Sequence, residues 1–359
     1  MGLSYNENVN ETDTKKEIIL QSNITLDLNG SVIKQIENDK INYANVSIND
    51  VENVIIENGT LIGDKEKHNY KDRNSSHEWG FGIDIRASKN VNLKCLQIEE
   101  MTGDDVIITD LINKNSENII IDNCNIKGCR RQGISIIFGE NIEINNCEIF
   151  NIEGTAPQAA IDLESWNVRQ NIDNIKIHNN KIYDLGSKQA IFVLEKAKTV
   201  DISNNELYGG IYSNNIREIL NIEKNEVYDC KICIELPEDF KARGEFIKRS
   251  VIKNNKLNNT SICLKNVNDA VIRNNILKNK GSIIYNTNIA IYRKIFYDNA
   301  IKQFHIGVEN TDMNYKVFVG QNEYYNIDEN IEWISNKQIE ISNDENKIEK
   351  YIDRVEKGD

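Results

Sequence analysis

A short pattern recurs along this sequence, and it limits the possible folds more than any other feature. A polar residue is followed by apolar residues at alternate positions and then by asparagine, as in NIIIDNC from Asn118 and NIEINNC from Asn141. Ten copies begin between Asn23 and Asp269, at a mean spacing of roughly 27 residues. A repeat of this length indicates a solenoid, in which each copy stacks on its neighbours.

The repeated element is a strand, because apolar and polar residues alternate with a period of two. A second short apolar run separates most copies, for example Gly133–Ile137 and Ala160–Glu164. The chain has only two prolines, which favours strands further. We therefore expect an all-β, single-stranded right-handed parallel β-helix, with asparagines stacked from coil to coil on the inside of a turn. A β-sandwich would need more Asn-Gly hairpin turns than the sequence contains.

The repeats divide the chain into three segments. Residues 1–17 form a polar leader, residues 18–285 the predicted β-helix, and residues 286–359 a C-terminal cap. The cap ends in apolar residues at helical spacing, which predicts an amphipathic terminal helix. We expect no signal peptide in this chain, because its first residues lack an apolar core, and no membrane span, because no apolar run is long enough.

The net charge disfavours two kinds of partner, and the cysteines have a separate structural interpretation. The formal net charge of −13 disfavours nucleic acid, which needs a concentrated basic surface, and it disfavours a densely anionic polysaccharide unless a cation bridges the two. The seven cysteines are an odd number, and we expect buried free thiols that act as small apolar side chains. Cys230 and Cys233 have zinc-like spacing but no second pair, so we expect no metal or other cofactor.

The second apolar run of each coil carries acidic residues at positions that should face outward. Alignment of these runs predicts that one residue of each faces inward (Ile83, Ile107, Ile134, Ile161 and Ile191) and that the next faces outward (Asp84, Ile108, Ser135, Asp162 and Phe192). Just before the runs, Asp104 aligns with Arg131 and Gln158, and Asp105 aligns with Gln132 and Ala159. Asp162 and Glu164 then lie on one face of a strand, about 6.5–7 Å apart.

An insertion beside this face adds further candidate residues. HNYKDRNSSHEWG begins at His68, in the longest step between two copies of the repeat. Trp79 offers an aromatic face on which a sugar ring can stack, and His77 or Glu78 could assist proton transfer. The alternative is a structural role, in which Trp79 packs over the edge of a coil.

Four strings give the chain a resemblance to a known family: HEWGFGIDI, GDDVII, RRQGISI and GTAPQAAIDLES. They resemble a subgroup of bacterial and phage proteins in the pectin-lyase-like superfamily of right-handed parallel β-helices, over about residues 18–285. Gly103-Asp104-Asp105 is similar to a string of the polygalacturonase-type hydrolases whose aspartates catalyse, although the Gly-His-Gly and Arg-Ile-Lys strings of those enzymes are absent. The resemblance implies a polysaccharide partner, an extracellular or virion-associated location and, as in phage relatives, a homotrimer.

These observations together predict a polysaccharide-degrading glycoside hydrolase, which needs two carboxyl groups flanking the scissile bond. Asp105 and Asp162 are the preferred acid/base pair, and Glu164 and Asp104 are further candidate carboxylates. The predicted substrate-binding residues are two arginines, one glutamine, three residues of the insertion and one aspartate. They are Arg130 and Arg131, Gln158, His77, Glu78 and Trp79, and Asp84.

Two alternatives stay open. In a calcium-dependent polysaccharide lyase, Asp84, Asp162 and Glu164 would hold Ca²⁺, and Arg131 or Arg130 would abstract a proton, although arginine holds its own proton strongly. In a non-catalytic spike or adhesin, the same face would only bind glycan.

Overall fold

The computed structural model describes residues 17–71, 76–111, 114–165, 171–194, 197–236, 247–265, 267–278, 284–286, 306–309, 316–320, 323–325 and 357. These residues form strands joined by turns, which confirms the predicted all-β class. The chain divides into two compact units, residues 1–191 and 192–359, with the boundary inside strand β17 (Gln189–Leu194). Each unit is a stack of parallel β-coils, as expected for a right-handed parallel β-helix.

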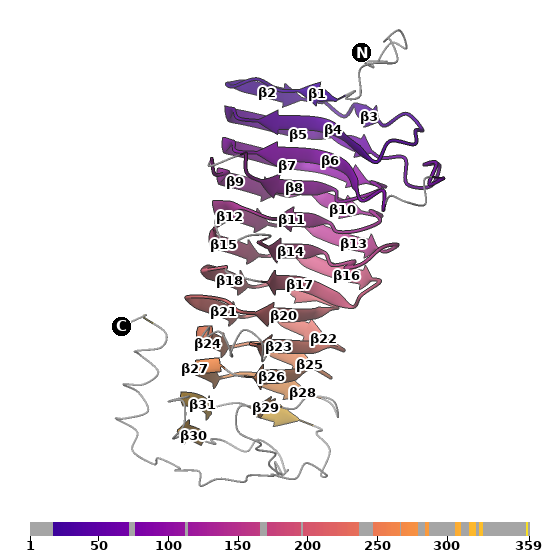
Figure 1. The fold of residues 1–359 in the computed structure, drawn as a ribbon. Coiled ribbons are helices and arrows are strands. Elements are labelled where there is room, and N and C mark those ends of the chain that lie inside the picture. Colours follow the sequence, from indigo (N-terminus) through magenta and orange to yellow (C-terminus); the bar gives the residue numbers. More distant parts are fainter. Residues whose placement is uncertain are drawn as a thin grey trace. The chain divides into compact units, whose positions relative to one another are not determined.

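In the first unit, one strand of every coil belongs to a sheet that we call sheet A. Adjacent strands of sheet A are parallel and come from consecutive coils, so that residues about one repeat apart in sequence lie side by side (Figure 1). The strands are β1 (Ile18–Ile19), β4 (Asn42–Asn49), β6 (Trp79–Arg86), β8 (Val106–Thr109), β11 (Ile134–Ile136) and β14 (Ile161–Glu164).

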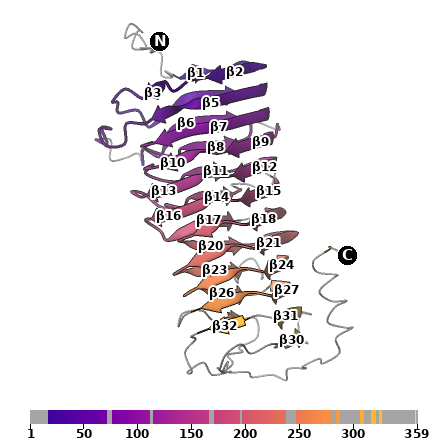
Figure 2. The ribbon, with the colours of Figure 1, turned by 180° about the vertical axis from the view of Figure 1, so that it is seen from behind.

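The remaining strands of the first unit form sheet B. Its long strand β7 pairs with both β9 and β10, so each later coil has two shorter strands where an earlier coil has one. Figure 2 shows β10, β13 and β16 following one another along the stack. The strands are β2 (Ile24–Asp27), β3 (Val32–Lys34), β5 (Glu52–Ile62), β7 (Lys89–Glu99), β9 (Glu117–Asp122), β10 (Asn125–Lys127), β12 (Gly139–Asn145), β13 (Glu148–Ile152), β15 (Ile172–His178) and β16 (Lys181–Leu185).

The second unit repeats the arrangement. One sheet contains β20 (Gly210–Asn214), β23 (Lys231–Glu235), β26 (Ser261–Lys265) and β29 (Ile284–Asn286). The other contains β18 (Thr199–Ser203), β19 (Glu206–Leu207), β21 (Ile219–Glu223), β22 (Glu226–Tyr228), β24 (Ile247–Lys253), β25 (Lys256–Asn258), β27 (Val267–Arg273), β28 (Ile276–Lys278), β31 (Lys316–Gly320) and β32 (Glu323–Tyr325). Strand β30 (Ile306–Glu309) is antiparallel to β31.

Parts of the chain after residue 285 continue the coils of the second unit. Strands β31 and β32 pair in parallel with β27 and β28, although they lie in the segment that the sequence assigned to a cap. The predicted terminal helix lies outside the described residues apart from Lys357, and so does the leader apart from Glu17. No helix long and apolar enough to cross a membrane occurs among the residues that the structure describes.

The core of the first unit is built from columns of apolar side chains that stack from coil to coil. In one column, Ile83, Val106, Ile134 and Ile161 pair in register and are fully buried. β-Branched side chains pack well on a pleated surface, and each one removed from water stabilises the fold by about 1.5–3 kcal/mol. The alternation seen in the sequence is therefore the direct cause of this column.

Asparagines form two kinds of ladder, one buried and one exposed. A buried ladder in the second unit joins Asn205, Asn225, Asn255 and Asn275, as predicted for the inside of a turn. The asparagine that opens the repeat instead forms an exposed ladder in the first unit, in which each side-chain amide after the first donates to the asparagine of the preceding coil: Asn23, Asn53, Asn90, Asn118, Asn141 and Asn174. All six have a left-handed backbone, with φ between 50° and 63°, a conformation that asparagine tolerates better than most residues.

The cysteines are all unbonded, and most of them fill the interior. Cys124, Cys129, Cys147 and Cys263 are buried, as expected for apolar fillers. Cys95 is exposed, contrary to that expectation, because it occupies a left-handed turn position with a φ of 52°.

The buried ladder leads to a stability prediction. Asn225 donates to the Ile202 carbonyl (2.8 Å) and to Asn255 (3.1 Å), and it accepts from Asn205 (2.9 Å). Asn225→Ala leaves these buried partners unpaired and should lower the free energy of unfolding by about 1–3 kcal/mol or more in urea titrations. The matched control, Asn118→Gly, removes an exposed amide and keeps the left-handed backbone, so it should cost less. Equal losses in the two variants would show that burial of the ladder adds nothing.

Candidate functional site

The loops that lead from sheet B into sheet A carry most of the predicted site residues. In the first unit the described parts of these loops are residues 63–71, 76–78, 100–105, 128–133 and 153–160, and we call them the loop stack. Backbone hydrogen bonds join them across coils, from Gly103 to Gly80 (2.9 Å), from Arg131 to Gly103 (3.2 Å) and from Gly133 to Ala159 (3.2 Å). Side chains far apart in sequence therefore lie together on this edge of the coils.

The register of β8 differs by one residue from the predicted alignment. Ile107 pairs with Asp84 and with Ser135, whereas Ile108 pairs with Ile85 and Ile136. The column predicted to face outward therefore contains Asp84, Ile107, Ser135 and Asp162. The length of the preceding loop sets this register, and a shift of one residue moves each side chain to the opposite face of a strand.

Among the predicted catalytic residues, Asp105 is the one whose position is changed most by the one-residue difference in the register of β8. Val106 lies beside Ile134, so Asp105 lies beside Gly133 and not beside Gln132 as predicted. Its carboxyl group is fully buried near the Cys129 thiol, which opposes the effect of burial on the pKa of Asp105. Burial raises the pKa of Asp105 well above its ordinary value. Asp105 therefore lies in the interior, where it cannot contact a substrate as one of the predicted acid/base pair.

Five polar side chains of the loop stack and sheet A form a connected cluster, which we call the Arg131 network. Arg131 Nη1 donates to both carboxylate oxygens of Asp104 (3.1 and 3.0 Å) and to Gln132 Oε1 (2.6 Å). The Ser135 hydroxyl donates to Asp104 (2.7 Å) and contacts Gln132, whose amide in turn donates to Asp162. The network thus links Asp104 to Asp162 across three coils.

Burial sets the electrostatics of the two acids in the network. Asp104 and Asp162 are fully buried, contrary to the prediction of an exposed acidic face. Burial raises the pKa of Asp104, and the Arg131 charge opposes that rise. Burial, together with repulsion from Glu164, raises the pKa of Asp162 to about 8, against opposing effects of Gln132 and Arg131. Asp162 therefore carries a proton at neutral pH.

Glu164 and Glu78 lie at the partly exposed side of this network. Glu164 is two residues beyond Asp162 on β14 and half-buried, so the two side chains share a face about 6.5–7 Å apart. Glu78 lies 3.6 Å from Arg131 Nε, and its side chain is 28% exposed against 16% for Arg131. Three charged groups can therefore meet solvent or a ligand above the buried acids.

Sequence reasoning missed two members of the network. The sequence alignment contained Gln132 only as the residue aligned with Asp105, and Ser135 only as a residue predicted to face outward. In the structure they provide the hydrogen bonds between the two buried acids. Both lie in the RRQGISI string, so that string was the available signal.

Arg130 and Gln158, two residues predicted to orient a sugar, are engaged with the backbone. Arg130 Nη1 donates to the carbonyls of Ser76 (3.0 Å) and His77 (3.2 Å), and its guanidinium lies over the Tyr70 ring at 4.9 Å. Gln158 Oε1 accepts from the Gly154 amide (3.1 Å) within its own loop. Both side chains hold loops in place in this structure.

The calcium set of the lyase alternative is not brought together. Three strand steps separate Asp84 from Asp162, which corresponds to about 14 Å along the stack. Arg86 Nε donates to both oxygens of Asp84, at 2.8 and 2.9 Å. Within the described ranges, no three His, Cys, Asp or Glu side chains are grouped so that they could hold a metal ion.

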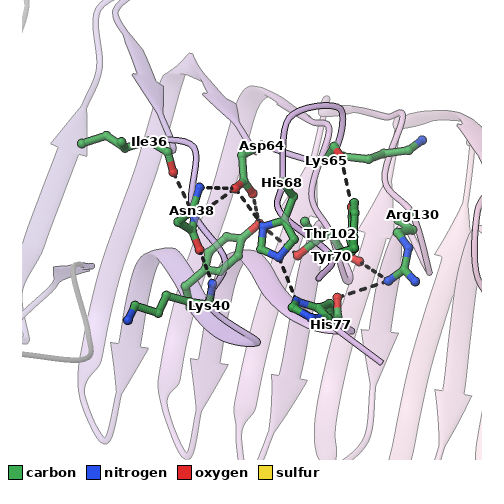
Figure 3. Close-up of polar contacts among 11 residues, drawn as sticks. Ile36, Asn38, Lys40, Asp64, Lys65, His68, Tyr70, His77, Thr102 and Arg130 are labelled. Atoms are coloured by element: carbon green, nitrogen blue, oxygen red, sulfur yellow. Dashed lines mark hydrogen bonds and ion pairs between the residues drawn. The ribbon is translucent and has the colours of Figure 1, made fainter. Parts of the chain in front are cut away.

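Trp79 and His77, the aromatic candidates, have different environments. Trp79 is 41% exposed, with its ring edge-on to Phe81 at 6.3 Å, so its position suits contact with a ligand. His77 is buried and contacts His68, which itself contacts Asp64 (Figure 3). His77 therefore does not reach the surface as a proton-transfer residue, and sequence reasoning gave Asp64 and His68 no role.

Comparison with curated proteins finds two relatives and no matching family model. The chain is 33% identical over 165 residues to the uncharacterized protein YclG of Bacillus subtilis, and 32% identical over 164 residues to the SPbeta prophage-derived uncharacterized protein YorA of the same organism. Each match covers 42% of this chain and only 28% of the relative.

Solved structures share the fold at low sequence identity. The mannuronan C-5 epimerase AlgE4 A-module of Azotobacter vinelandii aligns with a TM-score of 0.51 at 14% identity, over 74% of this chain and 82% of its own. An exopolygalacturonase of Thermotoga maritima aligns with a TM-score of 0.51 at 14% identity, over 90% of this chain and 84% of its own. The chain therefore has the right-handed parallel β-helix fold, as its sequence predicted.

The raised pKa of Asp162 leads to a prediction about stability and pH. The folded state holds this proton up to about pH 8, whereas an unfolded aspartate loses it near pH 4, so the free energy of unfolding should fall as pH rises between these values. Asp162→Asn cannot ionise and should show a weaker fall in urea titrations at pH 5, 7 and 9. Glu164→Gln removes the repulsion that helps to raise this pKa, so it should show a fall that is weaker than native but steeper than in Asp162→Asn. A decline as steep in Asp162→Asn as in the native protein would contradict the assignment.

Proposed function

We propose that this protein is a polysaccharide-degrading glycoside hydrolase in which Asp162 is the general acid and Glu164 the general base. One observation carries the proposal: Asp162 has a pKa of about 8 and lies on the same strand face as Glu164. A protonated carboxyl group and a second carboxyl group at this spacing are the pair that glycoside hydrolysis needs.

The separation of the pair favours inversion of the anomeric carbon. Two carboxyl groups about 6.5–9.5 Å apart leave room for a water molecule, whereas retention needs about 5–5.5 Å. Asp162 would protonate the leaving oxygen while Glu164 activates the water on the opposite side of the sugar. Arg131, held by Asp104 and Gln132, would orient the substrate, and Trp79 would stack on a sugar ring.

The comparisons support the substrate class of this proposal. The two structural neighbours are named for action on mannuronan and for exopolygalacturonase activity, and both substrates are polysaccharides. The prophage origin of one curated relative supports the proposed extracellular or virion-associated location. A homotrimer remains part of the proposal on the strength of the family resemblance alone.

A lyase mechanism has less support from the geometry. Arg131 donates to Asp104 and to Gln132, and although burial opposes it, the Asp104 charge raises the pKa of Arg131. A guanidinium held in this way is a poor base. We therefore do not assign Arg131 to proton abstraction.

A second candidate function is non-catalytic glycan binding. The observation that favours it is the complete burial of Asp104, Asp105 and Asp162, because a general acid has to contact the substrate oxygen that it protonates. In this case the partly exposed groups of the face, Glu78, Arg131, Glu164 and Trp79, would bind the sugar without cleaving it.

Digestion of a glycan library, with reducing ends and product masses as the readout, tests the proposal. The native protein should release new reducing ends, and Asp162→Asn or Glu164→Gln should lower the rate about 10²–10⁴-fold, the usual contribution of general acid–base catalysis. Activity should fall as pH rises above about 8, because Asp162 then loses its proton. The control is Asp84→Asn, an aspartate about 14 Å away along the stack, which should remain active.

Each other outcome points to a different function. Binding of a glycan with no new reducing ends would show a glycan-binding protein. Products that absorb near-ultraviolet light would show a lyase. Full activity of Asp162→Asn would exclude Asp162 as the acid.

A further inference from the structure

A buried chain of three side chains runs beside the Arg131 network. Asp64 Oδ2 lies 2.9 Å from His68 Nδ1, and His68 Nε2 lies 2.9 Å from His77 Nδ1 (Figure 3). The side chains of Asp64 and His68 are wholly inaccessible to solvent. We call these three residues the histidine relay.

The Asp64 carboxylate fixes the direction of its own hydrogen bond to His68. Asp64 accepts from the backbone amide and the side-chain amide of Asn38 (both 3.0 Å) and from the Tyr43 hydroxyl. A carboxylate only accepts, so His68 donates from Nδ1. A second hydrogen bond joins His68 Nε2 to His77 Nδ1. Because these nitrogens are directed at one another, they do not converge on a metal ion.

The relay ties together loops from several coils of the first unit. Asn38 belongs to the loop after β3, Asp64 and His68 to the loop after β5, and His77 to the segment that enters β6. Tyr43 extends the contacts to Thr102 in the next loop (3.0 Å). Arg130 also holds the segment that contains His77, because it donates to the carbonyls of both Ser76 and His77. Figure 3 shows Arg130 beside His77.

His77 is the residue that connects the histidine relay to the candidate site. Its φ of 51° lies in the left-handed region, where a residue other than glycine is held at a cost of about 1–3 kcal/mol by the surrounding structure. The next two residues are Glu78, which lies 3.6 Å from Arg131, and Trp79, which is 41% exposed. The backbone of His77 thus sets where both side chains emerge.

We propose that the histidine relay is a positioning device for the ligand-binding face: His68 holds His77, and His77 places Glu78 against Arg131 and Trp79 beside the substrate. His68 and His77 are positioning residues, since neither contacts the sugar. The ligand class, a polysaccharide, rests on the proposed function, whereas the ordering of the segment from Ser76 to Trp79 does not.

Two substitutions of His68 distinguish its hydrogen bond to Asp64 from its hydrogen bond to His77. The side-chain amide of asparagine reaches the Nδ1 position, so His68→Asn keeps the bond to Asp64 and loses the bond to His77. The amide of glutamine reaches the Nε2 position, so His68→Gln keeps the bond to His77 and loses the bond to Asp64. A residue that served only the stability of the loop would be impaired similarly by the two changes.

Amide hydrogen exchange of residues 76–82 in the full chain is the first readout. Exchange should rise about tenfold in His68→Asn, the equivalent of one hydrogen bond of about 1.4 kcal/mol, and should stay within about threefold of native in His68→Gln. The matched control is His178→Asn, because His178 is a partly exposed histidine that contacts Glu143 at 2.9 Å on β15. This control should leave residues 76–82 unchanged. Equal exchange in the two His68 variants, or no change in either, would overturn the proposal.

Glycan affinity is the second readout. With a glycan identified by the library digestion, His68→Asn should raise KM or the dissociation constant about tenfold while kcat stays within about threefold, and His68→Gln should behave nearly as the native protein. If the exchange results hold and the native protein neither binds nor cleaves any glycan, the proposed function fails and the ordering of the segment stands. If exchange rises and affinity does not change, the role of the relay in ligand binding is excluded.

Discussion

The hydrogen bonds between equivalent strands of successive coils are the constraint on which the rest of this structure depends. They hold adjacent strands in parallel and in register, so residues one repeat apart become neighbours. The apolar column through Ile83 and Ile134 and the exposed asparagine ladder both follow from this pairing. The same pairing also places Asp104, Gln132 and Asp162 within reach of one another, although they come from three different coils.

The polar network is stable in a buried place because its members compensate one another. A buried carboxylate without a partner costs several kcal/mol, and Asp104 avoids this cost through Arg131 and Ser135. Asp162 has only the amide of Gln132 as a partner in the network, and it responds by holding its proton. Asymmetry of this kind, between a paired acid and a protonated one, is a common basis for acid–base chemistry, and it is why we place the acid at Asp162.

The sequence predicted the architecture well because periodicity is a local property. Alternating isoleucines identify the strands, and the repeat identifies the stack, without any knowledge of contacts between distant residues. The candidate site was harder to predict from the sequence, because its geometry depends on the lengths of the loops. The alignment placed Ile107 where Val106 lies, and this single shift placed Asp105 beside Gln132 in the prediction, whereas it lies beside Gly133 in the structure. The histidine relay had no periodic signal, since Asp64, His68 and His77 belong to loops that do not repeat.

The one-residue difference at β8 also bears on how such proteins diversify. The strand VIIT pairs correctly whichever face each side chain takes, because the backbone bonds of a parallel ladder do not depend on side-chain identity. Gain or loss of a single residue in the loop before it would replace Ile107 in this column with Val106 or Ile108, and it would move the polar residue before the strand, Asp105, to a different position on the coil. Small insertions and deletions in the loops, more than substitutions in the strands, are therefore the efficient route by which evolution can give one inherited scaffold a new surface.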